Sequence, residues 1–354
     1  MARRWTHAPA GSRWGEFGPD DQRGRMNLVT PAKVLQGVAE VKEGRTFCLS
    51  LPLDVPGGQT MNPRRIAPRR YAVLRDGKSA GQQGFCWSYA NEDAELSDVV
   101  NDDVVLMSLQ YSTQWDSLAH VGSRFGADGD GVSEPVFYNG FRAGEDIVPG
   151  REDVAAAEAF ARYPGPEAKA LGIERLAEHG AQGRGVLIDL EHHVGRRRQA
   201  VGYETLMHIL DADGVEVEAG DMVCLHTGFA DTLLAMNRQP DVERLHRTGS
   251  GLDGWDDKML NWIVDVKLAC LLADNPAVEL VVPKLATPTP MRRPRLPLHE
   301  HCLFKNGIHL GELWYLTELA AWLRLHGRTR FLLTAPPLRL PGAVGSPATP
   351  IATV

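Results

Sequence analysis

Short apolar runs that end at glycine constrain the fold of this 354-residue chain most strongly. Two of them, G-V-L-I-D-L from Gly185 and D-M-V-C-L-H-T-G from Asp221, are typical of short strands that are buried on both faces. Helical spacing occurs between and after them, over residues 203–210 and 258–272. Because strands alternate with helices along the chain, we predict an α/β protein that is built on a mixed sheet.

The composition excludes several classes of partner. Lys and Arg number 38 and Asp and Glu 45, so the formal net charge is −7, which argues against a general binder of nucleic acid or anionic membranes. No apolar run reaches the roughly 18 residues of a membrane-spanning helix. The 36 Gly and 23 Pro follow no collagen-like or linker-like period, so they serve turns. We therefore expect a small-molecule substrate, and neither nucleic acid nor a membrane as a partner.

Compartment and domain organisation follow from similar observations. The five cysteines are widely spaced, form no C-x-x-C pair and lie mostly in apolar runs, which indicates buried thiols in a reducing compartment. The first residues contain two arginines but no apolar stretch, so we expect neither signal peptide nor anchor, and a cytoplasmic location. No repeat or shift in composition divides the chain. We expect one domain over residues 1–354, with the polar, aperiodic residues 61–101 as an excursion or flap.

One polar cluster follows the run D-V-V-L-M-S-L, which we interpret as a buried strand. Within eleven residues it contains Gln110, Ser112, Thr113, Gln114, Asp116 and His120. Asp116 is its anion, His120 is a base that titrates near neutral pH, and the two glutamines offer amide oxygens. Such clusters at strand ends are typical of α/β active sites. The alternative is a capped turn with a histidine that is satisfied by its neighbours.

A second cluster lies in P-L-H-E-H-C-L-F-K-N-G-I-H-L-G-E-L-W and contains His299, Glu300, His301, His309 and Glu312. On a strand, His299 and His301 would share a face and could hold a metal together. Glu312 lies where a strand from Ile308 would end. A metal would join the two clusters through Asp116, one or both glutamines, a histidine and Glu312. The alternative is a set of surface histidines around a turn.

Other catalytic motifs are missing from the sequence. There is no G-x-S-x-G nucleophile elbow, and no glycine-rich loop matches the dinucleotide or the P-loop fingerprint. A serine hydrolase, a Rossmann enzyme and a P-loop NTPase are therefore disfavoured.

Six ordered blocks resemble the metal-dependent cyclase/hydrolase family, which is represented by bacterial kynurenine formamidase and isatin hydrolase. Q-Y-S-T-Q-W-D-S-L-A-H is similar to the signature H-x-G-T-H-x-D-x-x-x-H of that family. The other blocks are W-G-E-F-G-P-D-D-Q-R-G-R-M-N-L, G-D-M-V-C-L-H-T-G, L-A-D-N-P-A-V-E, L-H-E-H-C-L-F-K-N-G-I-H-L-G-E-L-W and P-L-R-L-P-G-A-V-G-S-P. Together they cover most of the chain, which is thus identified as a member of the family.

The resemblance implies a three-layer β/β/α fold of the swivelling type with a mixed sheet, and hydrolysis of an amide, imide, lactam or lactone with a divalent metal. It also implies a homodimer or homotetramer, which the apolar helix around Trp262 favours as well. In formamidase-like members, the first two histidines and the aspartate of the signature bind metal. A later histidine and a glutamate complete a dinuclear zinc centre, and the last signature histidine moves protons.

Carried over by position, Asp116 matches the aspartate and His120 the proton-moving histidine. His299 matches the later histidine best, with His301 as the alternative, and Glu312 matches the glutamate. The remaining ligand positions are occupied by Gln110 and Gln114, where the family signature has histidines.

This departure changes the metal that we expect. An amide oxygen is a neutral, hard donor and binds metal more weakly than imidazole, so it suits Mn²⁺ better than Zn²⁺. The resemblance to isatin hydrolase-like members, with a single manganese and a glutamine ligand, makes the substitution tolerable. We expect one site, with Mn²⁺ favoured over Zn²⁺. Its expected ligands are Gln110, Gln114, Asp116, His299 and Glu312. Loss of the metal is the alternative.

The mechanistic hypothesis is that the metal activates a water and polarises the scissile carbonyl, while His120 takes the proton and returns it to the leaving atom. Trp14, Trp87 and Trp115 are expected to form an aromatic wall for a planar substrate. Two rival functions stay open. One is a cyclase or dehydratase that closes a ring, and the other is a degenerate member that binds a small ligand without catalysis.

Overall fold

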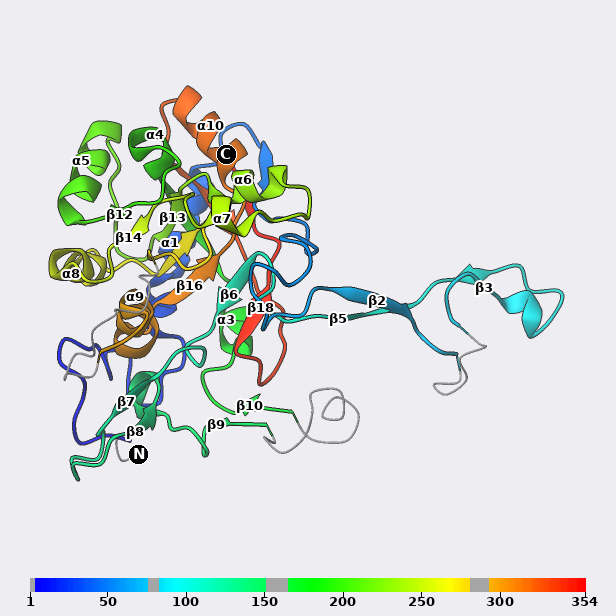
Figure 1. The fold of residues 1–354 in the computed structure, drawn as a ribbon, viewed down its shortest axis with the longest axis horizontal. Coiled ribbons are helices and arrows are strands. Elements are labelled where there is room, and N and C mark those ends of the chain that lie inside the picture. The colour runs from blue at the N-terminus through cyan, green and yellow to red at the C-terminus, as the bar shows by residue number, and fades with distance from the viewer. Residues whose placement is uncertain (1–3, 76–82, 151–164, 281–292) are drawn as a thin grey trace.

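A nine-stranded mixed sheet forms the centre of the computed structural model, which describes residues 4–75, 83–150, 165–280 and 293–354 (Figure 1). The strands β11, β13, β15 and β16 are parallel neighbours at its middle, and the strands beside them run antiparallel. In spatial order the strands are β1 (Thr46–Cys48), β19 (Ile351–Thr353), β17 (Arg330–Thr334), β11 (Gln182–Asp189), β13 (Met222–His226), β15 (Cys270–Ala273), β16 (His309–Glu312), β6 (Gln114–Asp116) and β18 (Gly345–Pro347).

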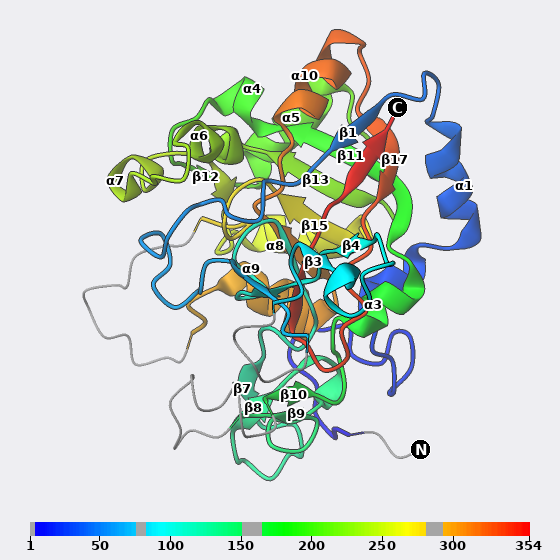
Figure 2. The same cartoon turned by 90° about the vertical axis from the view of Figure 1, so that its right-hand side faces the viewer.

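Alternating side chains of the central strands supply two hydrophobic cores, one on each face of the sheet. On β11, Val186 and Ile188 belong to the first core, and Leu187 belongs to the second. The first core is closed by α5 (Tyr203–Asp213) and α8 (Asp257–Asp265). The second is closed by α1 (Pro31–Ala39), α3 (Glu174–His179) and α10 (Thr317–Leu325). Figure 2 shows α1 beside β17 and β11. The α/β class and the mixed sheet that the sequence predicts are confirmed.

The other described elements are short. The helices are α4 (Leu190–Val194), α6 (Phe229–Ala235), α7 (Val242–Leu245) and α9 (Pro297–His299), which continues into the π-helix η4 (Glu300–Lys305). The 3-10 turns are η1 (Gly24–Leu28), η2 (Tyr89–Asn91) and η3 (Tyr138–Gly140). Two-stranded ribbons pair β7 (Ser123–Phe125) with β8 (Glu134–Val136), β9 (Ile147–Val148) with β10 (Glu167–Ala168), and β12 (Ala200–Val201) with β14 (Gly251–Leu252). In the described part of the chain, no helix has both the length and the apolar character needed to cross a bilayer.

The helix that we expected over residues 258–272 is wrong in its second half. Helix α8 ends at Asp265, Lys267 adopts a left-handed φ of 55°, and the apolar run that follows is the buried strand β15. A short apolar run fits a buried helix or a buried strand equally well. Here the run is a strand because it pairs with β13 on one side and β16 on the other. A central strand thus ends beside the polar cluster that is described below.

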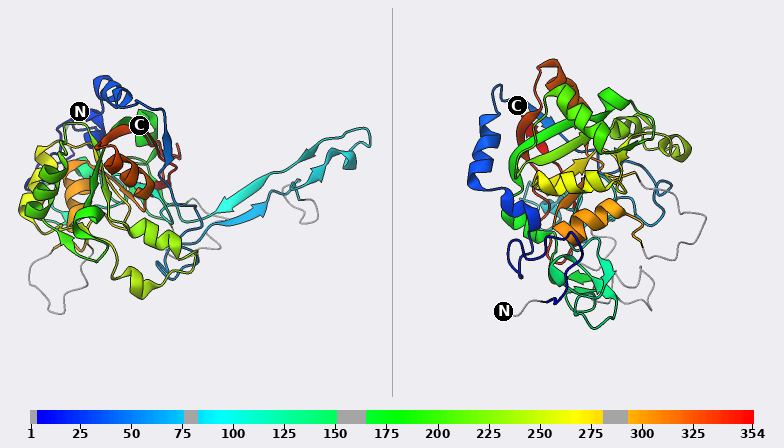
Figure 3. Two further views of the ribbon diagram at one scale, coloured as in Figure 1. Left: turned by 90° about the horizontal axis from the view of Figure 1, so that it is seen from above. Right: turned by 90° about the vertical axis from the view of Figure 1, so that its left-hand side faces the viewer.

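Most of residues 61–101, which we expected to form an excursion or flap, belong to a long two-stranded ribbon. Strand β2 (Arg69–Ala72) pairs with β5 (Asp103–Leu106), and β3 (Trp87–Ser88) pairs with β4 (Val99–Val100) nearer the tip. We call residues 69–106 the arm; residues 76–82 within it lie outside the described part. The arm projects away from the body of the molecule (Figures 1 and 3). The strand that we predicted at D-V-V-L is confirmed as β5, but its predicted burial is wrong. All four residues are exposed, because β2 is the one strand of the described structure that pairs with them.

Candidate metal centre

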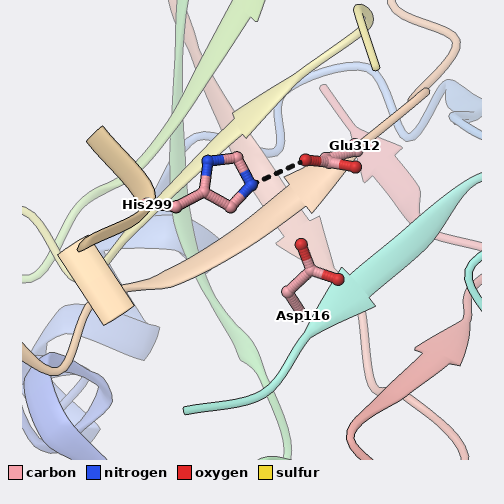
Figure 4. A group of neighbouring side chains, drawn as sticks. All are labelled: Asp116, His299 and Glu312. Atoms are coloured by element: carbon pink, nitrogen blue, oxygen red, sulfur yellow. Dashed lines mark hydrogen bonds and ion pairs between the residues drawn. The ribbon is translucent and has the colours of Figure 1, made fainter. Parts of the chain in front are cut away.

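Asp116, His299 and Glu312 meet at one end of the central strands (Figure 4). Asp116 is the last residue of β6, Glu312 is the last residue of β16, and His299 ends the short helix α9. One ligand atom from each side chain lies within 4.8 Å of the others, and all three side chains are buried. The structure thus brings together both sequence clusters, which are almost two hundred residues apart.

Strand pairing explains why these carboxylates converge. In the antiparallel pair of β6 and β16, Gln114 lies opposite Glu312, and Asp116 shares the face of Gln114 because side chains two residues apart point the same way. Trp115 lies between them and points to the opposite face. There its ring packs edge-on against Trp314, with 5.4 Å between the ring centroids.

A second glutamate holds the ring of His299. Nδ1 of His299 lies 2.8 Å from Oε1 of Glu279, and Nε2 lies 3.1 Å from Oε1 of Glu312. Glu279 also accepts hydrogen bonds from the backbone N–H groups of Leu298 and His299, so its carboxylate is fixed. Burial lowers the pKa of His299, but the hydrogen bonds to both glutamates outweigh burial and raise it to about 10. Glu279 was missed as a site residue, although it ends the family block L-A-D-N-P-A-V-E.

The donors of this cluster fit a divalent cation. Oδ2 of Asp116 is buried and has no hydrogen-bond partner among the described residues, which is costly for a carboxylate oxygen. Burial, together with the nearby charge of Asp116, raises the pKa of Glu312. Two buried carboxylates with an imidazole nitrogen are a ligand set of the kind that holds Mn²⁺ or Zn²⁺. A bound cation would neutralise the carboxylates and satisfy the free oxygen.

Gln114 lies beside this cluster but turns its amide nitrogen toward it. Nε2 donates to Oε2 of Glu312 at 2.9 Å and to Oδ1 of Asp116 at 3.3 Å, while Oε1 accepts a hydrogen bond from Arg65 at 3.2 Å. In this orientation the amide oxygen, the atom that we expected to bind metal, faces Arg65. Gln110 lines the adjoining cavity, with its side chain against Gly345 and its backbone carbonyl bonded to Arg65.

The two candidate histidines for the metal are separated by the local backbone. Residues 297–305 are helical rather than extended, so His299 and His301 do not share a face, and the strand that we expected here is wrong. His301 is buried outside the cluster, and burial lowers its pKa to about 4. His299 is therefore the histidine that lies in the cluster with Asp116 and Glu312. His120 lies at its edge, with Nε2 3.8 Å from Oδ1 of Asp116 and a side chain that is 26% exposed.

A cavity of about 900 Å³ opens onto the cluster. His120, His299 and Glu312 are among its lining residues. Apolar side chains also line it, namely Met61, Phe229, Leu245, Leu296 and Leu313. So do four arginines, Arg64, Arg65, Arg198 and Arg295. The cavity can therefore enclose a small molecule that has an apolar part and an anionic part.

The aromatic wall that we expected is not part of this cavity. Trp14 packs edge-on against Phe304 at 5.3 Å and donates its indole N–H to the backbone carbonyl of Phe304. Trp87 lies in the arm, and Trp115 is buried in the second core. These positions follow from strand register and ribbon geometry, which the sequence does not display.

A second group of possible ligands, Asp189, Glu191 and His226, does not resemble a metal site. Asp189 already binds His226 at 2.7 Å and also Arg324, and Glu191 binds Arg196 at 3.0 Å. Because each carboxylate already has a cationic or hydrogen-bonded partner, these contacts account for the group without a metal ion.

Comparison with known proteins places this chain in a family. The family model described as "Putative cyclase" matches residues 49–280, which is more than half of the chain. The chain belongs to this cyclase family. The matched segment includes Asp116, His120 and Glu279. None of the curated proteins matches the sequence.

Solved structures share the fold of this cyclase-family protein over nearly its whole length. The crystal structure of a novel cyclase is 28% identical, with a TM-score of 0.71, and covers 97% of this chain and 99% of its own. Isatin hydrolase A from Ralstonia solanacearum is 13% identical, with a TM-score of 0.52 and coverage of 91% and 97%. Isatin hydrolase A from Labrenzia aggregata, bound to benzyl benzoate, is also 13% identical, with a TM-score of 0.53 and the same coverage. These likenesses confirm the cyclase-type fold that the sequence resemblance implied.

Proposed function

We propose that this cyclase-family protein is a metal-dependent hydrolase that opens an amide, imide, lactam or lactone bond of a small cyclic or N-acyl substrate. The observation that carries the proposal is the buried group of Asp116, His299 and Glu312 at the cavity, with a carboxylate oxygen that lacks a partner in the described structure. The fold shared with isatin hydrolases supports it.

Each residue of the site has a distinct role in this mechanism. Asp116, His299 and Glu312 would hold the metal, Mn²⁺ in preference to Zn²⁺ because two of the three donors are carboxylates. When bound, the ion would supply Lewis acidity toward the scissile carbonyl and toward water. His120, at the cavity edge, takes the proton from the attacking water and returns it to the leaving nitrogen or oxygen as the bond to the carbonyl carbon breaks. Glu279 keeps the His299 ring in place.

The first test is turnover by the variant Asp116→Ala on a panel of lactams, lactones, cyclic imides and N-acyl amines. We expect the wild type with Mn²⁺ to hydrolyse at least one member, and Asp116→Ala to lose more than about 1,000-fold in rate, since it removes a ligand of the catalytic ion. Asp98→Ala is the matched control, because Asp98 is an exposed carboxylate in the arm. Full activity in metal-depleted Asp116→Ala would contradict the mechanism.

The family description favours a ring-closing reaction as the second candidate. The same acid–base group could expel water from an open substrate as a ring closes. Product analysis that starts separately from open and closed forms distinguishes the two directions. Binding of panel members without any turnover would instead indicate a ligand binder.

We also propose that the protein forms a homodimer or homotetramer through its arm. Val99, Val104 and Val105 are 57%, 50% and 51% exposed there. A two-stranded ribbon that shows apolar side chains to water is marginally stable on its own, so burial against a second copy would stabilise it. Trp262, which we expected to mark the contact, is half-buried against the first core of its own chain.

A further inference from the structure

Arg65 enters the cavity from the base of the arm on a fixed backbone. Its N–H donates to the carbonyl of Asn62 at 3.0 Å. The next residue, Ile66, is paired in both directions with Ser108: its N–H donates to the serine Oγ at 2.8 Å, and its carbonyl accepts from the serine N–H at 3.0 Å. The guanidinium group is therefore attached to a segment whose position is set by both sides of the arm.

The side chain of Arg65 is connected to the metal ligands through one amide. Nη1 donates to the backbone carbonyl of Gln110 and, at 3.2 Å, to Oε1 of Gln114. On the other side of that amide, Nε2 donates to Glu312. The orientation of the amide is determined on both sides, because a flip would place its N–H₂ against the guanidinium and its oxygen against the carboxylates. Arg65 thus forms a hydrogen bond with Oε1 of Gln114, the atom that would otherwise be free to bind the metal.

The remaining donors of this arginine are available to a ligand. Among the described residues, only Nη1 has hydrogen-bond partners, and Nε and Nη2 have none. Arg65 lines the cavity together with Glu312, His299 and His120. A guanidinium group presents parallel N–H donors that match the two oxygens of a carboxylate. Arg65 therefore has both the position and the free donors of an anion-binding group.

The charges of the proposed metal centre favour such a group during hydrolysis. The charge of a divalent cation would be balanced by the carboxylates of Asp116 and Glu312, so the metal centre by itself would offer no excess positive charge to the reaction. When the oxygen of water adds to the carbonyl carbon and the bond to the leaving atom breaks, His120 carries one proton of that water to the leaving atom. The second proton passes from the new carboxylic acid to bulk solvent or to the released amine, so the carboxylate product keeps one negative charge. A fixed cation beside the reacting carbonyl stabilises that charge more than bulk water would.

We propose that Arg65 is the anion-binding residue of this site and receives the negative charge that develops on the substrate carbonyl and stays on the carboxylate product. This inference rests on the proposed function, and it names the ligand chemistry: a compound that presents a carboxylate oxygen to Arg65 beside the metal ligands. Among the four arginines of the lining, Arg65 is the one that we assign to the metal ligands, because it is connected to Glu312 through Gln114, which fixes its direction.

Calorimetric titration with benzoate, and with the neutral isostere benzamide, tests the inference without turnover. We expect the Mn²⁺-loaded wild type to bind benzoate at least about tenfold more tightly than benzamide. Arg65→Gln removes most of this preference, because it deletes the charge and keeps a polar side chain, and Arg65→Lys keeps part of it. Arg69→Gln, which removes an exposed arginine outside the cavity lining, leaves the preference unchanged.

The same preference for benzoate in Arg65→Gln and in the wild type would overturn the inference. Thermal unfolding of each variant identifies a misfolded protein. If Arg65→Gln is misfolded, the comparison of Arg65→Lys with the wild type tests the inference instead. The titration is repeated without metal, so a protein that binds no Mn²⁺ still reports on Arg65. Failure of the proposed function would appear as absent metal binding and turnover, whereas failure of this inference would appear as an unchanged preference for benzoate.

Discussion

At the residue scale, His309 stands out among the groups outside the site. It lies on β16, 1% exposed, and neither ring nitrogen has a hydrogen-bond partner among the described residues. Burial, with a smaller contribution from His179, lowers its pKa to about 3. In the unfolded chain a histidine has a pKa of about 6.5. Below that pH the unfolded chain binds a proton that the folded protein does not, so the free energy of unfolding falls as the pH falls toward 3.

We therefore predict that His309→Leu reduces the acid sensitivity of the fold. Between pH 7.5 and pH 5, His309 should account for about 2 kcal/mol of the decrease in the free energy of unfolding. Urea titrations at the two pH values measure the decrease for each protein. His208→Leu, at an exposed position, serves as the control and should respond to acid as the wild type does. An unchanged decrease in His309→Leu would contradict the prediction.

At the scale of elements, how far each side chain could be predicted depended on local periodicity. Asp116 and Glu312 were predicted as ligands from strand ends and family blocks, and the register of β6 and β16 explains why the two side chains converge. The choice between His299 and His301 needed the helical backbone of residues 297–305, because apolar and polar residues are mixed there without a clear period. Trp115 was predicted to lie on the wrong face of its strand, because a shift of one residue along a strand reverses the face.

Two further elements depended on contacts far away in the sequence. The run after Lys267 is a strand because β13 and β16 pair with it. Strand β5 is exposed because, among the described strands, it pairs with β2 alone. Arg65 carried no signal in the sequence at all, since it lies in a polar, aperiodic segment and meets Gln114 only after the strands have paired. Such contacts over a long sequence separation cannot be derived from local patterns.

At the scale of the whole molecule, the proposal that copies of the chain associate through the arm makes a testable prediction. The variant Val104→Glu/Val105→Glu places two charges on the exposed strand β5. Light scattering coupled to size exclusion should show the wild type as a dimer or tetramer, and the double variant shifted toward the monomer by at least about tenfold in dissociation constant. Arg69→Gln/Arg70→Gln, on the paired strand, is the matched control. A monomeric wild type, or an unchanged assembly in the glutamate variant, would contradict association through the arm.

The central claim is that Asp116, His299 and Glu312 form one metal centre in the folded molecule. The most direct measurement is the metal content per chain, by elemental analysis of protein that is purified after growth with both manganese and zinc. We expect about one equivalent of divalent metal, mainly manganese, in the wild type and in Asp98→Ala, and none in Asp116→Ala. A wild type that binds no metal, or an Asp116→Ala variant that still binds a full equivalent, would contradict the account.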